Sequence, residues 1–484
     1  MSTNPLLDTT GLPLFDQIKP EHVTPALDVL LADAEAALTK VTGPDVPPAS
    51  DALSLQPDVS TERLGRAWGA VGHLNSVADT PEIRAAYNEN LPRITEFYTR
   101  LGSDERLYAK YKALNEAQKG LDPERRLSPA RQRALDLALR GFVLGGAELQ
   151  GEAKTRFAAI QEEHAAKSQA FSEHVMDATD AYSCYVRADE LAGVPEDVLH
   201  ATRAAAEAEG KEGHKLTLHM PCYLPVMQYA SNRALRETMY RAYATRASEF
   251  GPEERDNTAL MSDLLALRQE EARLLGYANY AEVSLVPKMA DSPDQVMHFL
   301  RDLAQRARPF AEKDMAELRD FARTECDLPD LQAWDVAFVS EKLKEARYAF
   351  SDQEVKQYFT EPTVLKGLFG LIEKLFDVQI QPDSAPVWHE SVRFFRIERA
   401  GQLIGQFYLD PYARVGKRPG AWMDDVRGRW TRPDTQGTQT PVAHLVCNFA
   451  KGVGDKPALL THDDVTTLFH EFGHGLHHML TQVN

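Results

Sequence analysis

The chain has 484 residues, of which 43% are hydrophobic and 26% are charged, an ordinary balance for a protein that folds around its own core. Its 72 acidic residues exceed its 54 Lys and Arg, and the net charge of -18 excludes the basic footprint of a nucleic-acid-binding protein. No apolar run is long enough to span a membrane, and residues 1–19 do not have the pattern of a secretion signal. We expect a cytoplasmic monomer without nucleic-acid or membrane partners.

The cysteines point to the same compartment. Cys184, Cys222, Cys326 and Cys447 are scattered along the chain, and no two of them have the spacing of a metal knot. Their pattern predicts free thiols in a reducing environment.

The first part of the chain, residues 1–190, reads as an N-terminal helical domain. A proline-punctuated arm over residues 1–20 precedes apolar residues at helical spacing from Val23 to Leu38. Residues 43–57 hold four prolines and are predicted to form a surface loop. From Ser60 to about residue 180 the pattern is helical almost without interruption.

Residues 191–385 are predicted to form the helical body of a second region. Around residues 215–227 apolar and polar side chains alternate, and Pro221 and Pro225 would limit any strand there to a sheet edge. Helical patterns resume over residues 232–275 and 293–323.

Residues 386–484 change character again and form the third region. Residues 392–398 and 402–408 flank a turn at Gly401 and predict a β-hairpin, while residues 442–449 predict a further strand. The fold class is therefore mainly α, with a small β-sheet preceding the last helix.

The last predicted helix contains the candidate catalytic and metal-binding residues. Its sequence is THDDVTTLFHEFGHGLHH over residues 461–478. On an α-helix His470 and His474 lie one turn apart and about 40° apart around the axis, so both imidazoles can reach one metal ion. Glu471 is rotated by about 100° from His470, off the metal but near a water bound in an open coordination position. The spacing predicts a zinc site in which Glu471 is the general base of a metallopeptidase.

The residues around the motif favour a buried helix with one open face. Thr461 and Asp464 have the spacing of a capping box, and Phe469, Phe472 and Leu476 supply an apolar flank. Gly473 and Gly475 are unfavourable inside a helix, so we expect a packing reason for them, such as close approach of a strand or of substrate.

Two other histidines of this helix, His477 and His478, are also candidate ligands. His474 and His478 also have metal-binding spacing, but Gly475 stands where the base would be, so that pair could bind metal without activating water. His477 is too far along the axis to share an ion with His470 and His474. A metzincin continuation would need Gly at position 477 and His at position 480, and the chain has His477 and Leu480 there, which excludes that class.

A peptide substrate could add to the edge of the small sheet by main-chain hydrogen bonds. The strand over residues 442–449 is the candidate edge strand, with the backbone of Leu445, Val446 and Cys447 as the predicted substrate-binding segment.

Several stretches together resemble the thimet oligopeptidase (M3) family of zinc metallopeptidases, from the first residues of the chain to the last. They are NPLL at residues 4–7, LPLF at 12–15, MPCYLPVM at 220–227, YLDPY at 408–412 and FHEFGHGLHH at 469–478. The resemblance implies a zincin-like, multi-helix ellipsoid with a deep substrate channel that admits short unfolded peptides. It also implies one Zn²⁺ ligated by His470 and His474, with Glu471 as the base. His444 stands where relatives tend to carry Tyr, and we do not expect it to be a ligand.

The resemblance further implies a third zinc ligand, a Glu on a following helix, and substrate-binding residues beyond it, all after Asn484. We therefore expect a C-terminally truncated catalytic domain that alone is inactive or weakly active. The main hypothesis is a zinc metalloendopeptidase that cleaves internal bonds of short peptides. The alternatives are a peptide-binding fragment without turnover, because the third ligand is absent, and a helical scaffold whose histidines are incidental.

Overall fold

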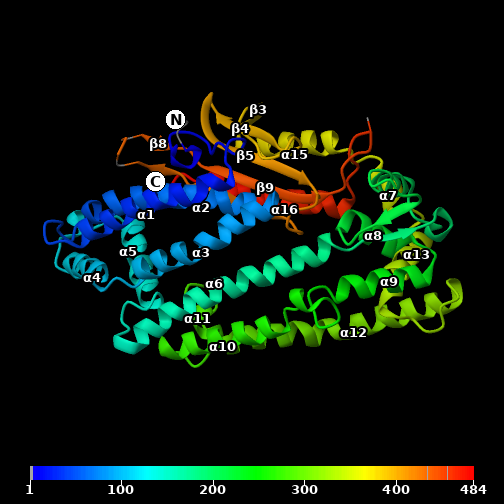
Figure 1. The fold of residues 1–484 in the computed structure, drawn as a ribbon, viewed down its shortest axis with the longest axis horizontal. Coiled ribbons are helices and arrows are strands. Elements are labelled where there is room, and N and C mark those ends of the chain that lie inside the picture. The colour runs from blue at the N-terminus through cyan, green and yellow to red at the C-terminus, as the bar shows by residue number, and fades with distance from the viewer. Residues whose placement is uncertain (1–3, 433, 436, 455, 484) are drawn as a thin grey trace. The chain divides into compact units, whose positions relative to one another are not determined.

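The computed structural model describes residues 4–432, 434–435, 437–454 and 456–483 (Figure 1). Its contacts divide the chain into two compact units. Unit 1 takes in the described parts of residues 1–172, 258–299 and 432–437, and unit 2 takes in residues 173–257, 300–431 and the described parts of 438–484. Neither unit is one continuous stretch. The three regions predicted from composition, 1–190, 191–385 and 386–484, stay a prediction.

Unit 1 is helical. In α1 the predicted apolar face is buried, from Val23 through Leu30 to Leu38, and the helix packs against α2 and α3. The helices of this unit are α1 (Pro20–Thr42), α2 (Ser50–Val77), α3 (Pro81–Gly102), α4 (Glu105–Lys119), α5 (Pro129–Leu144), the first part of α6 (Gly151–Asp180), α10 (Thr258–Leu274), α11 (Tyr280–Leu285) and the start of α12 (Pro293–Glu325). Short 3-10 turns lie at Pro5–Leu7 and Pro123–Arg125.

The predicted loop over residues 43–57 is only half right. The chain is irregular up to Ala49, but α2 already begins at Ser50 and runs through Pro57. The prolines at positions 44, 47 and 48 all precede the helix, so the prediction extended the loop too far by counting Pro57 with them.

Unit 2 begins with a second helical group. Its helices are the end of α6, α7 (Glu196–Glu207), α8 (Met220–Tyr229), α9 (Arg233–Ala244), most of α12, α13 (Val336–Tyr348), α14 (Asp352–Lys356), α15 (Glu361–Phe376) and α16 (His462–Met479). The 3-10 turns Ala188–Leu191, Glu253–Arg255 and Ala333–Asp335 connect them.

The predicted edge strand over residues 215–227 is wrong for most of its length. Only β2 (His214–Leu216) is extended, and it pairs with β1 (Cys184–Val186). Met220–Tyr229 is α8, with Pro221 in its first turn, where proline is well tolerated because the missing N–H has no helical partner. The alternating pattern was too short to exclude a helix.

The main sheet of unit 2 has the strand order β3-β4-β5-β9-β6. Its strands are β3 (Gln379–Asp383), β4 (Arg393–Arg399), β5 (Gln402–Tyr412), β6 (Trp422–Arg427) and β9 (Val442–Phe449), and a separate pair is formed by β7 (Trp430–Thr431) and β8 (Thr438–Gln439). The predicted hairpin is confirmed as β4 and β5, turning at Ala400 and Gly401, both of which have positive φ. The neighbours β5 and β9 are parallel, and the other pairs are antiparallel.

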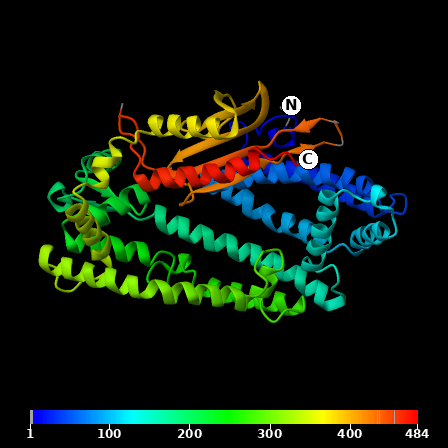
Figure 2. The ribbon, with the colours of Figure 1, turned by 180° about the vertical axis from the view of Figure 1, so that it is seen from behind.

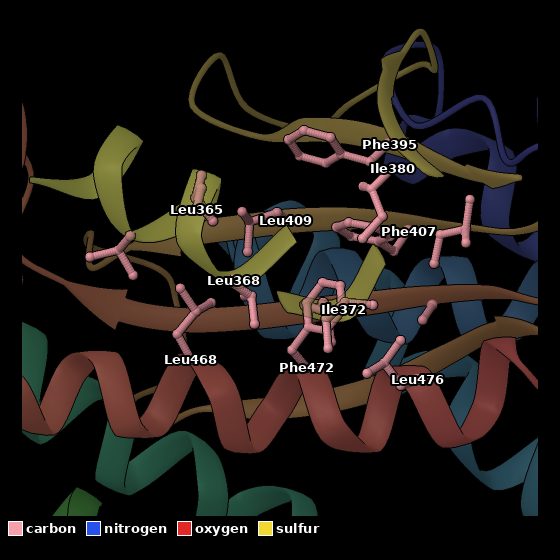
Figure 3. Close-up of a cluster of buried hydrophobic side chains, with 14 of the residues drawn as sticks. Leu365, Leu368, Ile372, Ile380, Phe395, Phe407, Leu409, Leu468, Phe472 and Leu476 are labelled. Atoms are coloured by element: carbon pink, nitrogen blue, oxygen red, sulfur yellow. The ribbon is translucent and has the colours of Figure 1, made fainter. Parts of the chain in front are cut away.

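One face of this sheet carries the core that holds the last helix. Phe407 and Leu409 of β5 and Leu445 of β9 belong to a buried cluster that also takes residues from α15 and α16. In Figure 3 Leu468, Phe472 and Leu476 point from α16 toward the strands, and Leu365, Leu368 and Ile372 belong to α15 beside it. Figure 2 shows α16 running along the strands from behind. The sheet therefore fixes which side of α16 is buried.

The mainly α fold with a small sheet before the last helix is confirmed, whereas the ellipsoid and its channel stay predictions. In the part of the chain that the structure describes, every helix is too short or too polar to cross a bilayer. All four cysteines are free thiols.

Candidate metal centre

The start of α16 has the predicted capping box. The Asp464 backbone N–H donates to Thr461 Oγ1 at 3.1 Å, and the Thr461 N–H donates to Asp464 Oδ2 at 2.8 Å. Burial raises the pKa of Asp464 above its usual range. The cap sets where the helix begins and so fixes the direction of every side chain that follows.

His470 and His474 lie together on the exposed face of this helix. Their Nε2 atoms are 3.1 Å apart, their ring centroids are 4.7 Å apart and the ring planes cross at 85°. Both residues are exposed, while Leu468 and Phe472 on the opposite side are buried. The predicted pair is thus brought together with its nitrogen atoms converging on one point.

This geometry suits zinc. Two nitrogen ligands about 2.0–2.1 Å from a tetrahedral Zn²⁺ lie roughly 3.3 Å from each other, close to the spacing of the two imidazoles. Zinc sites with a catalytic role have three protein ligands. Among the residues that the structure describes, no group of three or more His, Cys, Asp or Glu could hold a metal ion.

Glu471, the predicted base, lies at the boundary between the two faces of the helix. It is 8% exposed, whereas its neighbour His470 is exposed. Its carboxylate is close enough to Cys447 of β9 to add to the rise that burial causes in the pKa of the Cys447 thiol. The structure thus places a buried carboxylate next to an exposed histidine pair on one helix.

The alternative pair, His474 with His478, is disfavoured. His478 Nε2 lies 3.1 Å from the backbone oxygen of Arg427. A carbonyl oxygen can only accept, so this contact directs the His478 ring toward the backbone of β6. His478 Nε2 is thus engaged by β6, whereas the Nε2 atoms of His470 and His474 lie next to each other.

The two glycines differ. A Cβ atom at Gly475 would meet Leu445 Cδ2 at 3.0 Å, so close approach of a strand is confirmed as the packing reason there. At Gly473 a Cβ would meet nothing within 4 Å. Phe469 was predicted to join the buried flank, but it is 37% exposed, because it precedes His470 on the open side of the helix.

The prediction of an edge strand at residues 442–449 is wrong in its position. The strand exists with those bounds as β9, but it is hydrogen-bonded to β5 on one side and to β6 on the other. Leu445, Val446 and Cys447 are fully buried, so their backbone cannot receive a peptide. The edge next to β9 belongs to β6, where Asp424 and Asp425 are exposed. Periodicity identified the strand, but strand order depends on pairing between distant segments.

Sequence reasoning missed a buried charged cluster between β5 and β9. The side chains of Asp410 and Lys417 are 0% exposed and form an ion pair at 2.8 Å, and Arg414 pairs with the same carboxylate at 2.7 Å. Burial lowers the pKa of Lys417 to about 8, although Asp410 opposes that change. The only sequence signal was that Asp410 interrupts an apolar strand within the YLDPY stretch.

His444 of β9 is buried against aromatic rings. It is 3% exposed, and its ring packs against those of Trp388 and Tyr408, with centroids 5.3 Å from each. It lies on β9, whereas the histidine pair lies on α16.

An HExxH helix that is packed on a small mixed sheet and presents a converging histidine pair is an arrangement typical of metallopeptidases. The model of peptidase family M3 matches residues 226–484, and the model of the neurolysin/thimet oligopeptidase N-terminal domain matches residues 27–154. The chain belongs to peptidase family M3.

Similar proteins agree with this assignment. The chain is 46% identical to oligopeptidase A of Salmonella typhimurium and 46% identical to oligopeptidase A of Escherichia coli, in each case over 99% of this chain and 71% of the relative. It is 32% identical to dipeptidyl carboxypeptidase of Salmonella typhimurium over 99% of this chain and 70% of that protein.

Among solved structures, PZ peptidase A with an inhibitor matches with a TM-score of 0.48 and 16% identity, and a putative oligoendopeptidase F from Bacillus anthracis matches with 0.47 and 15%. Each match covers 93% of this chain, which spans 62% and 64% of the two solved chains respectively.

Proposed function

We propose that this chain is a zinc metallo-oligopeptidase that cleaves internal bonds of short peptides. The observation that carries the proposal is the 3.1 Å approach of two imidazole nitrogens on the open face of α16, next to the carboxylate of Glu471. Membership of peptidase family M3 and the similarity to oligopeptidase A support the substrate class.

In this proposal His470 and His474 hold one zinc ion per chain, together with a third protein ligand that the described residues do not bring to the pair. When bound, zinc polarises the scissile carbonyl and lowers the pKa of a bound water. Glu471 would take a proton from the attacking water as the water oxygen bonds to the scissile carbonyl carbon, and would give that proton to the leaving amine as the C–N bond breaks. A peptide would lie along the free side of β6, which takes the role that β9 was expected to have.

The test measures metal binding and turnover separately. Zinc affinity is measured by competition with a chromophoric chelator, and turnover with an internally quenched short peptide. We expect His470→Ala and His474→Ala to lose zinc binding, because two imidazoles are needed to chelate one ion. Glu471→Gln should keep zinc binding within about twofold and lose turnover by about two orders of magnitude or more.

The control is His477→Ala, which removes an exposed histidine of the same helix that cannot share the ion. Zinc and peptide binding without turnover would favour the peptide-binding alternative, in which the catalytic set is incomplete. Zinc binding that survives removal of both His470 and His474 would contradict the site, and absence of both zinc and peptide binding would favour the scaffold reading.

A further inference from the structure

Lys417 is the buried cation of the cluster between β5 and β9. Its Nζ donates to Asp410 Oδ1 at 2.8 Å, to the carbonyl oxygen of Tyr412 at 2.8 Å and to the carbonyl oxygen of Cys447 at 2.6 Å. The Asp410 carbonyl oxygen is a fourth contact at 3.1 Å. One side chain thereby connects the end of β5 to the end of β9.

Stability alone is a poor explanation for this lysine. Asp410 is already satisfied by Arg414, whose two terminal nitrogens each lie 2.7 Å from a carboxylate oxygen, and by Trp388 Nε1 at 2.9 Å. A second buried cation adds desolvation that an apolar side chain of similar volume would avoid. The hydrogen bond from Lys417 to the Cys447 carbonyl does not serve to neutralise Asp410, so it needs a separate explanation.

The pairing of β5 with β9 is interrupted where Lys417 reaches β9. The parallel register is regular up to Asp410 opposite Val446, then shifts, and resumes with Tyr412 opposite Phe449. Cys447 lies within this irregular stretch. A carbonyl at such a break needs another donor, and the Lys417 ammonium supplies one.

Cys447 lies opposite Glu471 of the HExxH helix. The close approach of Leu445 to Gly475 sets the register of β9 on α16. From Leu445 to Cys447 the strand advances by about 6.7 Å, and from Gly475 back to Glu471 the helix axis advances by about 6 Å. Because the two steps are nearly equal, Cys447 and Glu471 face each other. The electrostatic influence of Glu471 on the Cys447 thiol agrees with this register.

The loop between β5 and β6 is fixed at the same place. Asn448, the next residue of β9, donates from Nδ2 to the carbonyl oxygens of Arg418 and Gly420 at 3.0 and 2.6 Å. The Gly416 N–H donates to Asp180 Oδ2 at the end of α6, at 3.0 Å. The loop leads directly into β6, so its attachment also places that edge strand.

We propose that Lys417 is a positioning residue for the peptidase site: it fixes the end of β9 at Cys447 and so holds Glu471 of α16, and the start of β6, in place. The role in turnover rests on the proposed function, whereas the anchoring of β9 can be tested without it.

The main variant is Lys417→Met, which keeps most of the side-chain volume and removes the ammonium. Because Lys417→Met removes one donor from the buried Asp410 carboxylate, a second variant, Lys417→Met with Asp410→Asn, also removes the carboxylate charge. The matched control is Lys344→Met, which removes an ammonium that pairs with Glu341 of α13 and Asp352 of α14, neither of which belongs to the sheet.

The first measurement is the rate of iodoacetamide labelling of Cys447 in the native full chain, followed by peptide mass spectrometry with Cys184 as the internal reference. We expect both Lys417 variants to label Cys447 about tenfold faster than the wild type, because the strand end opens locally. Lys344→Met should leave the rate within about twofold, even where its urea midpoint falls.

The second measurement is peptide turnover with zinc affinity. A positioning role predicts that kcat falls about tenfold while KM and zinc affinity stay within about twofold, since the histidine pair is untouched. Equal Cys447 labelling in all variants overturns the anchoring, and faster labelling with unchanged kcat overturns the catalytic consequence. A wild-type chain that neither binds zinc nor turns over peptide overturns the proposed function and the catalytic role, and the labelling rates then decide the anchoring alone.

Discussion

Gly473 and Gly475 lie two positions apart on α16 and have opposite surroundings. A Cβ at Gly475 would meet Leu445 at 3.0 Å, whereas at Gly473 the space is open. Whether a larger side chain fits at a helix position therefore depends on the atoms packed against that position. The two glycines allow a direct comparison within one helix.

We expect Gly473→Ala to stabilise unit 2 by up to about 1 kcal/mol, because alanine restricts the unfolded chain and favours the helix. Gly475→Ala should lose that gain, because crowding against Leu445 costs about 1–3 kcal/mol in a well-packed core. Urea unfolding followed by circular dichroism measures both. Equal stabilisation by the two substitutions would show that β9 does not press on Gly475.

The surroundings of Asp335 decide its charge state in the same way that the surroundings of the two glycines decide which side chain fits. It is fully buried, and its carboxylate pairs with Arg233 at 2.6 Å and with Arg236 at 2.7 Å. Burial alone would raise the pKa of Asp335, but the hydrogen bonds from the two arginines outweigh it and hold the pKa below the usual 3.8.

A depressed pKa stabilises the folded state above the unfolded value near 3.8, and this contribution is lost as the pH falls through the folded value. Asp335→Asn should therefore destabilise the chain at pH 7 by roughly 3–5 kcal/mol, and the difference from wild type should shrink below about pH 4. Urea unfolding across pH 3–7 tests this. Asp320→Asn, in an exposed pair with Arg323, is the control and should change stability by less than about 1 kcal/mol. A difference that does not vary with pH would contradict the expected link to Asp335.

Among the elements, α16 depends on both its sequence and the sheet. Its start is set locally by the Thr461 and Asp464 capping box, and its buried side is set by β9 and α15. Its open side presents the histidine pair. The position of α16 therefore depends both on its own capping residues and on packing against the sheet and α15.

Thr461→Ala should destabilise unit 2 by about 1 kcal/mol, because one N–H of the first turn loses its acceptor. Thr466→Ala is the control inside the same helix. It removes only a hydroxyl that bonds back to the His462 carbonyl, and alanine has the better helix propensity, so we expect no loss of stability. Thermal unfolding followed at 222 nm measures both. Equal losses would mean that the cap does not decide where α16 begins.

At the scale of the whole molecule, the chain is organised as two units built from alternating stretches of sequence. All four cysteines, Cys184, Cys222, Cys326 and Cys447, lie in unit 2, which also contains the proposed zinc ligands. Thiol labelling during a heat pulse therefore reports on the unit that zinc would stabilise.

We expect zinc at about a hundredfold above its dissociation constant to stabilise unit 2 by about 2.7 kcal/mol and to slow labelling of these cysteines. In the double variant His470→Ala with His474→Ala, zinc should have no effect. Magnesium at the same concentration serves as the ionic-strength control. Equal protection of the wild type and the double variant would place the metal elsewhere.

The sequence by itself determined the mainly helical fold, the β4–β5 hairpin, the strand over residues 442–449 and the helix with His470, Glu471 and His474. These features depend on local spacing, which the period of a helix or strand converts directly into a shared face. The start of α16 was equally readable, since its cap needs only residues three apart.

Only the tertiary structure decided that β9 is central and that β6 forms the edge. It also decided that Pro221 lies in the first turn of a helix and that Lys417 reaches Cys447 across thirty residues of sequence. Each depends on which distant segments pair and on which charges are buried together. Local periodicity carries no information about either, because side chains alternate in the same way on a central strand and on an edge strand.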